Sequence, residues 1–286
     1  MAHTIYDIMS NLKMSFFINH IKGFSSVGTL IYCIALISCR TPDRFSNPVK
    51  DNSKKVLFEQ LELPSYDSRE DVIVYTGYTS SYNHTTLIPN WVAYELTADE
   101  IVEPALGNKY FIQDPNVRGR QATFEDYRND ECWDKGHMVP KADLKWSQKA
   151  YDESFFFTNI CPQYCSLNNG AWKSLEHKVR NMAKQYGRIY VVCGPIFDNY
   201  AYGTLGEQCV AIPDAFFKAL LLPVGNGFES IAFIMPNDGI RLSWQDYACS
   251  VEDLEILLDR NLFPALDNAV EDFVESQYNL KFWGLY

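Results

Sequence analysis

The chain has 286 residues, of which 47% are apolar and 15% aromatic, and its formal charge is −11 at pH 7. This composition excludes an intrinsically disordered protein, and the length suffices for one large folded domain or two smaller ones. The negative charge repels polyanions at long range, so a partner such as nucleic acid requires a local basic surface that outweighs the overall field.

The first 39 residues have the pattern of a secretory signal. Lys13 and Lys22 precede an uncharged run that is too short to span a bilayer but suits the apolar core of an export signal. The run ends in LISC at Cys39, which resembles a bacterial lipobox. We therefore expect a signal peptide over residues 1–39, lipid attachment at Cys39 in the bacterial cell envelope, and a polar tether over residues 40–65. The alternative is a buried apolar strand followed by an unrelated cysteine.

Residues 66–286 are expected to form a single domain. Its cysteine spacing assigns no disulfide partners, and the CxxxC pair lacks the second pair that a structural zinc site needs. For this pair, Cys161 and Cys165, buried thiols are the expectation, while Cys132, Cys193, Cys209 and Cys249 carry no assignment.

Strands dominate the predicted elements. Runs of β-forming residues between turn residues start at Asp71 and Asn90, and we expect these two to form an antiparallel pair. Further apolar runs closed by Pro, Gly or Asn predict strands that start at Glu153, Arg188, Gln208 and Glu229.

Helices are few in this pattern. Apolar residues recur at steps of three or four from Asn168 to Tyr186, and Gly187 ends the pattern as a plausible C-cap. Ser250 and Asp253 open a second helix with a capping-box pattern. Because most strands follow one another without an intervening helix, the sequence predicts an α+β fold with a central, mostly antiparallel sheet flanked by helices.

Three consecutive segments, DKGHMVP, ESFFFTNICPQ and LNNGAWKSLE, would form a compact ββα unit. Such a unit brings the imidazole of His137 and the amide of Asn168 to one place. Histidine suits a general base, and a neutral amide oxygen suits hydrated Mg²⁺, whose waters Glu176 could hold. These are the groups that phosphodiester hydrolysis requires.

The blocks between Trp91 and Pro236 resemble, in order, those of the DNA/RNA non-specific endonuclease family. The resemblance implies a ββα-metal (His-Me finger) core, an Mg²⁺ cofactor that Mn²⁺ can replace, and DNA and RNA as substrates. It also implies hydrolysis without strong sequence preference.

The family's DRGH signature falls on Asp134–His137, and its N-x-G-x-W-x-x-L-E block falls on Asn168–Glu176. The resemblance implies that His137 is the general base, that Asn168 binds the metal ion and that Glu176 binds metal-bound water. It assigns supporting roles to Asp134 and Asn159.

Lys135 stands where the signature has arginine, which keeps the charge but loses the planar fork that binds phosphate bidentately. A further family arginine that stabilises the pentacovalent phosphate matches Arg118 or Arg120, and we favour Arg120. Arg118 and Lys173 are then candidates for substrate binding.

Each candidate also has a structural explanation. A backbone carbonyl can satisfy His137, Asn168 can cap a helix, and Asn159 can fix a strand end. Glu176 can pair with Lys173 or Arg180 along the helix. Basic residues around His137 and along the helix can grip a phosphate backbone or simply be solvated, namely Lys141, Lys145, Lys149, Lys178, Lys184 and Arg188.

Two other functions remain open from the sequence. One is a catalytically weakened envelope protein that binds nucleic acid or another partner. The other is a phosphodiesterase of small nucleotides. The oligomeric state is left open as well.

Overall fold

The computed structural model describes residues 60–285 except 105, 108, 129–131, 199 and 200. The predicted signal peptide, Cys39 and the tether up to residue 59 lie outside these residues. Residues 60–65 are described with the folded unit, where Leu61 is buried and Ser65 Oγ donates a hydrogen bond to the Asn261 carbonyl at 3.1 Å. In the described part of the chain, no helix has the length and apolar character needed to cross a membrane.

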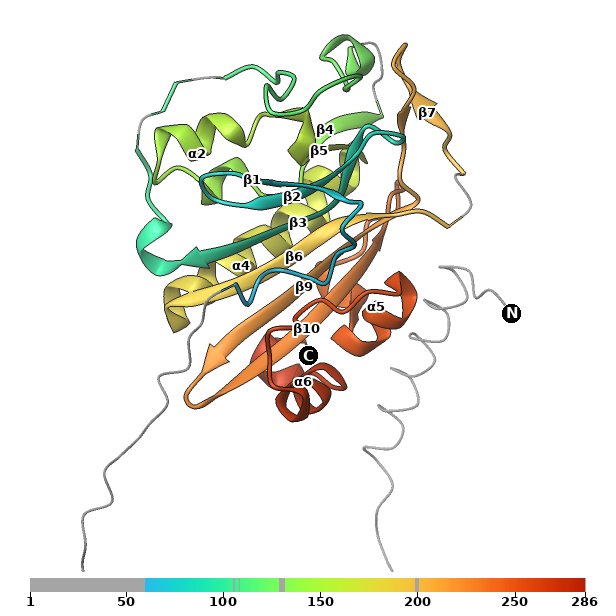
Figure 1. Ribbon diagram of the computed structural model, residues 1–286. Helices are drawn as coiled ribbons and strands as arrows, with labels where there is room; N and C mark the ends of the chain where they lie inside the picture. Colours follow the sequence, from blue (N-terminus) through green and yellow to red (C-terminus); the bar gives the residue numbers. More distant parts are fainter. Residues whose placement is uncertain (1–59, 105, 108, 129–131, 199–200, 286) are drawn as a thin grey trace, which may run out of the picture. The chain divides into compact units, whose positions relative to one another are not determined.

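A seven-stranded antiparallel sheet forms the centre of the fold, as the sequence predicts (Figure 1). Its strand order is β1-β2-β3-β6-β9-β10-β11. The strands are β1 (Asp71–Val74), β2 (Thr79–Asn83), β3 (Ile88–Thr97), β6 (Arg188–Ile196), β9 (Ala215–Val224), β10 (Gly227–Pro236) and β11 (Ala248–Cys249).

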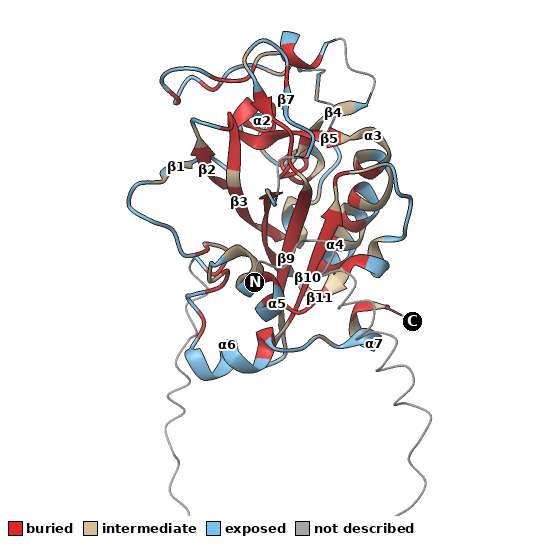
Figure 2. Cartoon of the chain, turned by 90° about the vertical axis from the view of Figure 1, so that its right-hand side faces the viewer, coloured by how far each residue is buried: buried red, intermediate tan, exposed pale blue. Residues whose placement is uncertain are grey.

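Helices cover both faces of this sheet. Helix α4 (Lys173–Tyr186) packs on one face and buries Leu175, Val179, Met182 and Ala183, the three-to-four spacing that predicted it. Helices α5 (Val251–Leu258) and α6 (Asn268–Glu275) lie on the opposite face, against β10. Figure 2 shows the buried residues concentrated in the strands between these layers.

Smaller elements complete the fold. The helical ones are η1 (Ala98–Glu100), η2 (Glu125–Tyr127), η3 (Lys141–Asp143), α2 (Gln148–Glu153), η4 (Phe157–Asn159), α3 (Cys165–Leu167), η5 (Asn168–Trp172), η6 (Trp244–Tyr247) and α7 (Leu280–Trp283). The remaining strands form two separate hairpins, β4 (Trp133–His137) with β5 (Ile160–Tyr164), and β7 (Thr204–Leu205) with β8 (Val210–Ala211).

Both predicted helix caps are confirmed. Gly187 follows α4 with φ +94°, a conformation that glycine adopts without a Cβ penalty, and its N–H donates to the Ala183 carbonyl. At the start of α5 the Asp253 N–H donates to Ser250 Oγ at 3.0 Å.

Three predicted strands are wrong in extent. The run from Asp71 is divided into β1 and β2, which pair with each other, and only β2 pairs with the strand that contains Asn90. The run from Glu153 is not extended, because Glu153 ends α2, the chain turns through η4, and β5 begins only at Ile160. Its apolar residues are buried on a turn, which a continuous apolar pattern cannot distinguish from a strand. The run from Gln208 is divided into β8 and β9 around Pro213, which has no N–H to donate to a ladder.

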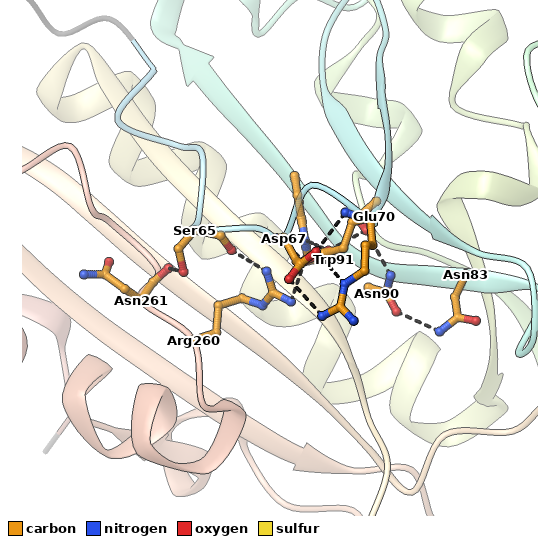
Figure 3. Close-up of polar contacts among 10 residues, drawn as sticks. Ser65, Asp67, Glu70, Asn83, Asn90, Trp91, Arg260 and Asn261 are labelled. Atoms are coloured by element: carbon orange, nitrogen blue, oxygen red, sulfur yellow. Dashed lines mark hydrogen bonds and ion pairs between the residues drawn. The ribbon is translucent and has the colours of Figure 1, made fainter.

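A polar network joins residues Ser65 and Glu70, before β1, to the segment after α5 (Figure 3). Arg260 Nη2 donates to Glu70 Oε1 at 3.0 Å and Arg260 also donates to the Ser65 carbonyl. Glu70 Oε2 accepts from Trp91 Nε1 at 2.9 Å and from Ser81 Oγ at 2.7 Å. The network closes the β1 edge of the sheet against the C-terminal part of the chain.

All six cysteines of the described part of the chain are free thiols. Of the CxxxC pair, Cys161 is buried as expected, but Cys165 is half-buried, so the expectation is wrong for Cys165. Cys165 begins α3, directly after β5.

Candidate active site

The β4–β5 hairpin positions His137 at the end of β4, where it pairs with Ile160. Within the hairpin, Gly136 lies opposite Cys161 and beneath the side chain of Gln163. A Cβ at residue 136 would lie 2.6 Å from Gln163 Cβ, closer than carbon atoms approach. Only glycine therefore fits directly before His137.

The imidazole of His137 is enclosed by two phenyl rings. Its centroid lies 5.4 Å from that of Phe111 and 5.6 Å from that of Phe155. Burial lowers the pKa of His137 to about 3, and the charge of Lys141 contributes to this shift. The ring is therefore neutral at pH 7. Its Nε2 atom has no hydrogen-bond partner among the described residues. The alternative explanation, in which His137 is hydrogen-bonded to a backbone carbonyl, therefore does not hold for this nitrogen.

Asp134 orients two asparagine side chains at the other end of β4. Asn168 Nδ2 and Asn169 Nδ2 each donate to Asp134 Oδ2 at 2.8 Å. Asn169 Nδ2 also donates to the Cys165 carbonyl at 2.9 Å. Because the amide nitrogen of Asn168 is committed to Asp134, its amide oxygen is the group left to accept or to bind a cation.

The helix that carries Asn168 differs from the prediction. It begins at Cys165, changes to a π-helical turn at Asn168–Trp172, and is interrupted at Gly170 with φ −107° and ψ −108°. Asn168 itself has helical angles, φ −55° and ψ −47°, so its predicted role as N-cap is wrong. The π-helical turn instead directs its side chain to β4. Such turns occur often at functional sites.

Trp172 joins this turn to His137. Its Nε1 donates to the His137 carbonyl at 3.3 Å, so β4 is bonded to the π-helical turn near both ends. The predicted ββα unit is therefore present. Lys135 and His137 both contact the Phe111 ring, while Asp134 contacts Asn168. No interaction of the described residues joins the imidazole directly to Asn168.

Lys135 lies in an aromatic cage. Its Nζ is 4.7 Å from the ring centroid of Phe124, 5.3 Å from that of Tyr127 and 5.7 Å from that of Phe111. Burial lowers the pKa of Lys135, and the charge of Asp134 opposes this shift. The cage places a cation beside Phe111, the residue that also contacts the His137 ring.

Glu176 has no ion-pair partner within 4.0 Å among the described residues. Arg180, which the sequence offered as an ion-pair partner of Glu176, binds Asp143 Oδ1 at 2.7 Å instead. The predicted ion pair between Glu176 and Arg180 along the helix is therefore wrong. Burial raises the pKa of Glu176 to about 7, and the charges of Lys218 and Arg180 limit the rise. Trp172 and Leu175 are fully buried, which confirms their predicted place in the core.

Asn159 fixes the chain directly after His137. It is fully buried, its Oδ1 accepts from the Val139 N–H at 2.9 Å, and its Nδ2 donates to the carbonyls of Val139 and Ser154 at 3.0 Å. The structural explanation offered for this residue therefore holds, and it supports the site through the backbone.

The remaining candidates are on the surface. Arg118, Arg120 and Lys173 are exposed, and none of the described contacts joins them to His137 or Asn168. Part of the predicted basic surface is neutralised by ion pairs: Lys145 with Glu103, Lys149 with Glu153, and Arg188 with Glu95. Lys141, Lys173, Lys178 and Lys184 have no such pair within the described part of the chain.

The donors around Asn168 fit a hydrated magnesium ion. Within the described residues, no three His, Cys, Asp or Glu side chains gather as a metal cage. Mg²⁺ needs no such cage, because it retains most of its waters and takes few protein oxygens. An amide oxygen oriented by the bond from Asn168 Nδ2 to Asp134 matches that requirement.

Sequence reasoning missed the aromatic residues around His137 and the buried Lys218 of β9. Phe111 and Phe155 carry no local signal, because they meet His137 only in the folded chain. Lys218 does carry one, since it is the single charge in the otherwise apolar run AFFKALLLP.

Comparison with known proteins identifies the family of the chain. The family model for DNA/RNA non-specific endonucleases matches residues 59–269. The mitochondrial nuclease EXOG of Homo sapiens is 29% identical over 237 residues, which are 76% of this chain and 62% of that protein. Endonuclease G of Bos taurus is 34% identical over 175 residues, which are 56% of this chain and 58% of that protein. The chain thus spans less than two thirds of the length of these two relatives.

A solved structure shares the fold. A chain in the crystal structure of the EndoG/EndoGI complex, which concerns the inhibition of EndoG, superposes with a TM-score of 0.66 and 25% identity. The match covers 72% of this chain and 91% of that chain. By the extent of the family match, the chain belongs to the DNA/RNA non-specific endonuclease family.

Proposed function

We propose that this protein is a Mg²⁺-dependent endonuclease that hydrolyses phosphodiester bonds of DNA and RNA. The observation that carries the proposal is a neutral His137 imidazole, whose Nε2 has no hydrogen-bond partner among the described residues, on a strand that is hydrogen-bonded to the turn bearing Asn168. Family membership supports the same activity.

In this mechanism the His137 imidazole accepts a proton from a water molecule as the water oxygen attacks phosphorus. The new P–O bond forms while the bond to the leaving oxygen breaks, and no covalent enzyme intermediate is needed. The lowered pKa of His137 keeps the base deprotonated at neutral pH. Phe111 and Phe155 hold the ring in one orientation, which favours attack along one path.

Asn168 Oδ1 would hold the cation, with Asp134 orienting the amide and Glu176 binding metal-bound water. Bound Mg²⁺, or Mn²⁺ in its place, would neutralise the charge that develops on the phosphate and the leaving oxygen.

Basic side chains would hold the nucleic-acid backbone. Lys135 contacts the same Phe111 ring as His137, and we assign the stabilisation of the pentacovalent phosphate to Arg120. Arg118 and Lys173 would contact neighbouring phosphates. Phosphate contacts carry no base information, so cleavage is expected to show weak sequence preference and a steep loss with salt.

We further propose that the protein is exported to the bacterial envelope and carries lipid at Cys39. The sequence pattern of the first 39 residues supports this localisation. Metabolic labelling with a radioactive fatty acid should label the wild type and not Cys39→Ser. Equal labelling would contradict the anchor.

The test of the activity is cleavage of plasmid DNA and of RNA by the purified chain with Mg²⁺ or with chelator. His137→Ala should lower the rate by about 10²–10⁴-fold. His84→Ala, which alters an exposed histidine bonded to Asp71, should cleave like the wild type.

Absence of cleavage by the wild type, with retained binding, would favour the catalytically weakened binding protein. Faster hydrolysis of dinucleotides than of long chains at matched salt would favour the phosphodiesterase of small nucleotides. Equal rates for wild type and His137→Ala would exclude the role assigned to His137.

A further inference from the structure

Lys218 is a fully buried lysine in the middle of β9. Its Nζ has no hydrogen-bond partner among the described residues, and no carboxylate of these residues lies within 4.0 Å of it. Burial of an ammonium group is unfavourable unless other interactions compensate it. Such a residue therefore needs an explanation beyond packing, because an apolar side chain would fill the same space in an apolar strand.

The indole of Trp172 makes a cation–π contact that compensates this burial, and the thiol of Cys193, opposite Lys218 on β6, also interacts with the ammonium group. Lys218 Nζ lies 4.2 Å from the Trp172 ring centroid, which is the distance of a close cation–π contact in a desolvated site. Asp143 and Glu176 add negative charge nearby. Burial raises the pKa of both carboxyl groups, and the Lys218 charge acts in the opposite direction on each.

Trp172 is also the residue that joins the two halves of the candidate site. Its Nε1 donates to the His137 carbonyl, and its backbone closes the π-helical turn that begins at Asn168. The turn is interrupted at Gly170, so the regular helix does not by itself fix the position of Asn168 relative to α4. The orientation of the indole plane then determines how the turn sits against β4.

We propose that Lys218 is a positioning residue that holds the Trp172 indole and, through it, the His137 end of β4 and the Asn168 turn. The inference rests on the proposed nuclease function. Because Lys218 is fully buried, it cannot contact a polynucleotide, and Trp172 is the residue of the Asn168 turn that its Nζ contacts.

The test compares Lys218→Met, which keeps the length of the side chain and removes the charge, with Leu220→Met on the same face of β9. Leu220 is also fully buried, so the second variant controls for repacking. For Lys218→Met we expect kcat on DNA to fall roughly tenfold or more while KM stays within about twofold, since misplacement of reacting groups affects the chemical step. Leu220→Met should retain kcat.

If Lys218 served only to stabilise the fold, Lys218→Met would lower the midpoint temperature of thermal unfolding. We expect Lys218→Met to unfold at a temperature equal to or above that of the wild type, because a buried charge is replaced by an apolar group. If Lys218→Met does not fold, the variant Trp172→Phe tests the same contact from its other side. It keeps an aromatic face but loses the hydrogen bond to the His137 carbonyl, and it should show the same loss in kcat.

The double variant Lys218→Met with Trp172→Phe should lose no more kcat than the greater single loss, because both act through one contact. Losses that multiply would overturn the inference, as would a kcat for Lys218→Met within twofold of the wild type.

A readout without turnover separates this inference from the proposed function. By NMR, exchange of the Trp172 indole N–H should be roughly tenfold or more faster in Lys218→Met than in the wild type. Unchanged exchange would overturn the positioning role even in an active enzyme. Faster exchange in a chain that does not cleave nucleic acid would retain the role of Lys218 and contradict the nuclease function alone.

Discussion

Asn168 and Asn169 donate to the same carboxylate oxygen of Asp134, yet we assign metal binding only to Asn168. Asn169 is exposed and also donates to the Cys165 carbonyl, so its amide is used within the turn. Asn168 makes only the Asp134 contact among the described hydrogen bonds, which leaves its oxygen for a cation.

This difference gives a matched pair of variants. Asn168→Ala should raise the Mg²⁺ concentration for half-maximal cleavage on the order of 10–100-fold or more, the range typical of lost metal-site contacts. Asn169→Ala removes the neighbouring bond to Asp134 and should change it far less. Magnesium titrations of the cleavage rate measure both. A larger effect of Asn169→Ala would contradict the assignment.

At the residue scale, the motif spacing identified His137, Asn168 and Glu176 but not their surroundings. The rings of Phe111 and Phe155 and the buried Lys218 come from distant parts of the chain. Sequence alone indicates which residue types are present. The burial that lowers the pKa of His137 is a product of tertiary packing, so it could not be derived before the fold.

At the scale of elements, the β4–β5 hairpin depends on Gly136. The side chain of Gln163 occupies the space that a Cβ at residue 136 would need. Gly136→Ala should lower the free energy of unfolding by about 1–3 kcal/mol through overpacking, and it should lower kcat because His137 is the next residue.

Gly227→Ala is the matched control, because no atom lies within 4 Å of the added Cβ there. Urea unfolding and cleavage rates measure both variants. Equal stability and activity of Gly136→Ala and the wild type would show that the hairpin tolerates the added carbon atom.

Helices and strands were predicted correctly where burial leaves a regular apolar pattern in the sequence. Strands β3, β6 and β10, helix α4 and its glycine cap were predictable, because burial of one face or a whole strand gives a clear apolar pattern. The turn at Phe157–Asn159 and the interruption at Gly170 were not. Both are stabilised by side-chain contacts with β4 and its following loop, which leave no periodic signal.

At the scale of the whole molecule, the α+β class and the antiparallel sheet follow from the order of elements, but the packing of α6 does not. Glu275 of α6 is buried, and its Oε1 has no hydrogen-bond partner among the described residues. Burial and the nearby charges of Glu255 and Glu271 raise its pKa well above the ordinary value of 4.5.

This shift predicts a pH-dependent stability. Above pH 4.5 the unfolded state releases the proton while the folded state keeps it, so the contribution of Glu275 is lost as the pH rises toward the folded-state pKa. Glu275→Gln should reduce the fall in the free energy of unfolding with pH, by up to about 1.4 kcal/mol per pH unit.

Urea unfolding between about pH 5 and pH 8 measures this slope. Glu252→Gln, a change at an exposed position of α5, is the control and should leave the slope unchanged. The same slope in Glu275→Gln and the wild type would contradict the burial of a protonated Glu275.

The hydrolytic cation is located most directly by anomalous diffraction from crystals of the protein grown with Mn²⁺. We predict one peak about 2.1 Å from Asn168 Oδ1, with water molecules as its other ligands and the His137 ring across the position of a bound phosphate. A cation held by other side chains, with none at Asn168, would contradict the proposed site.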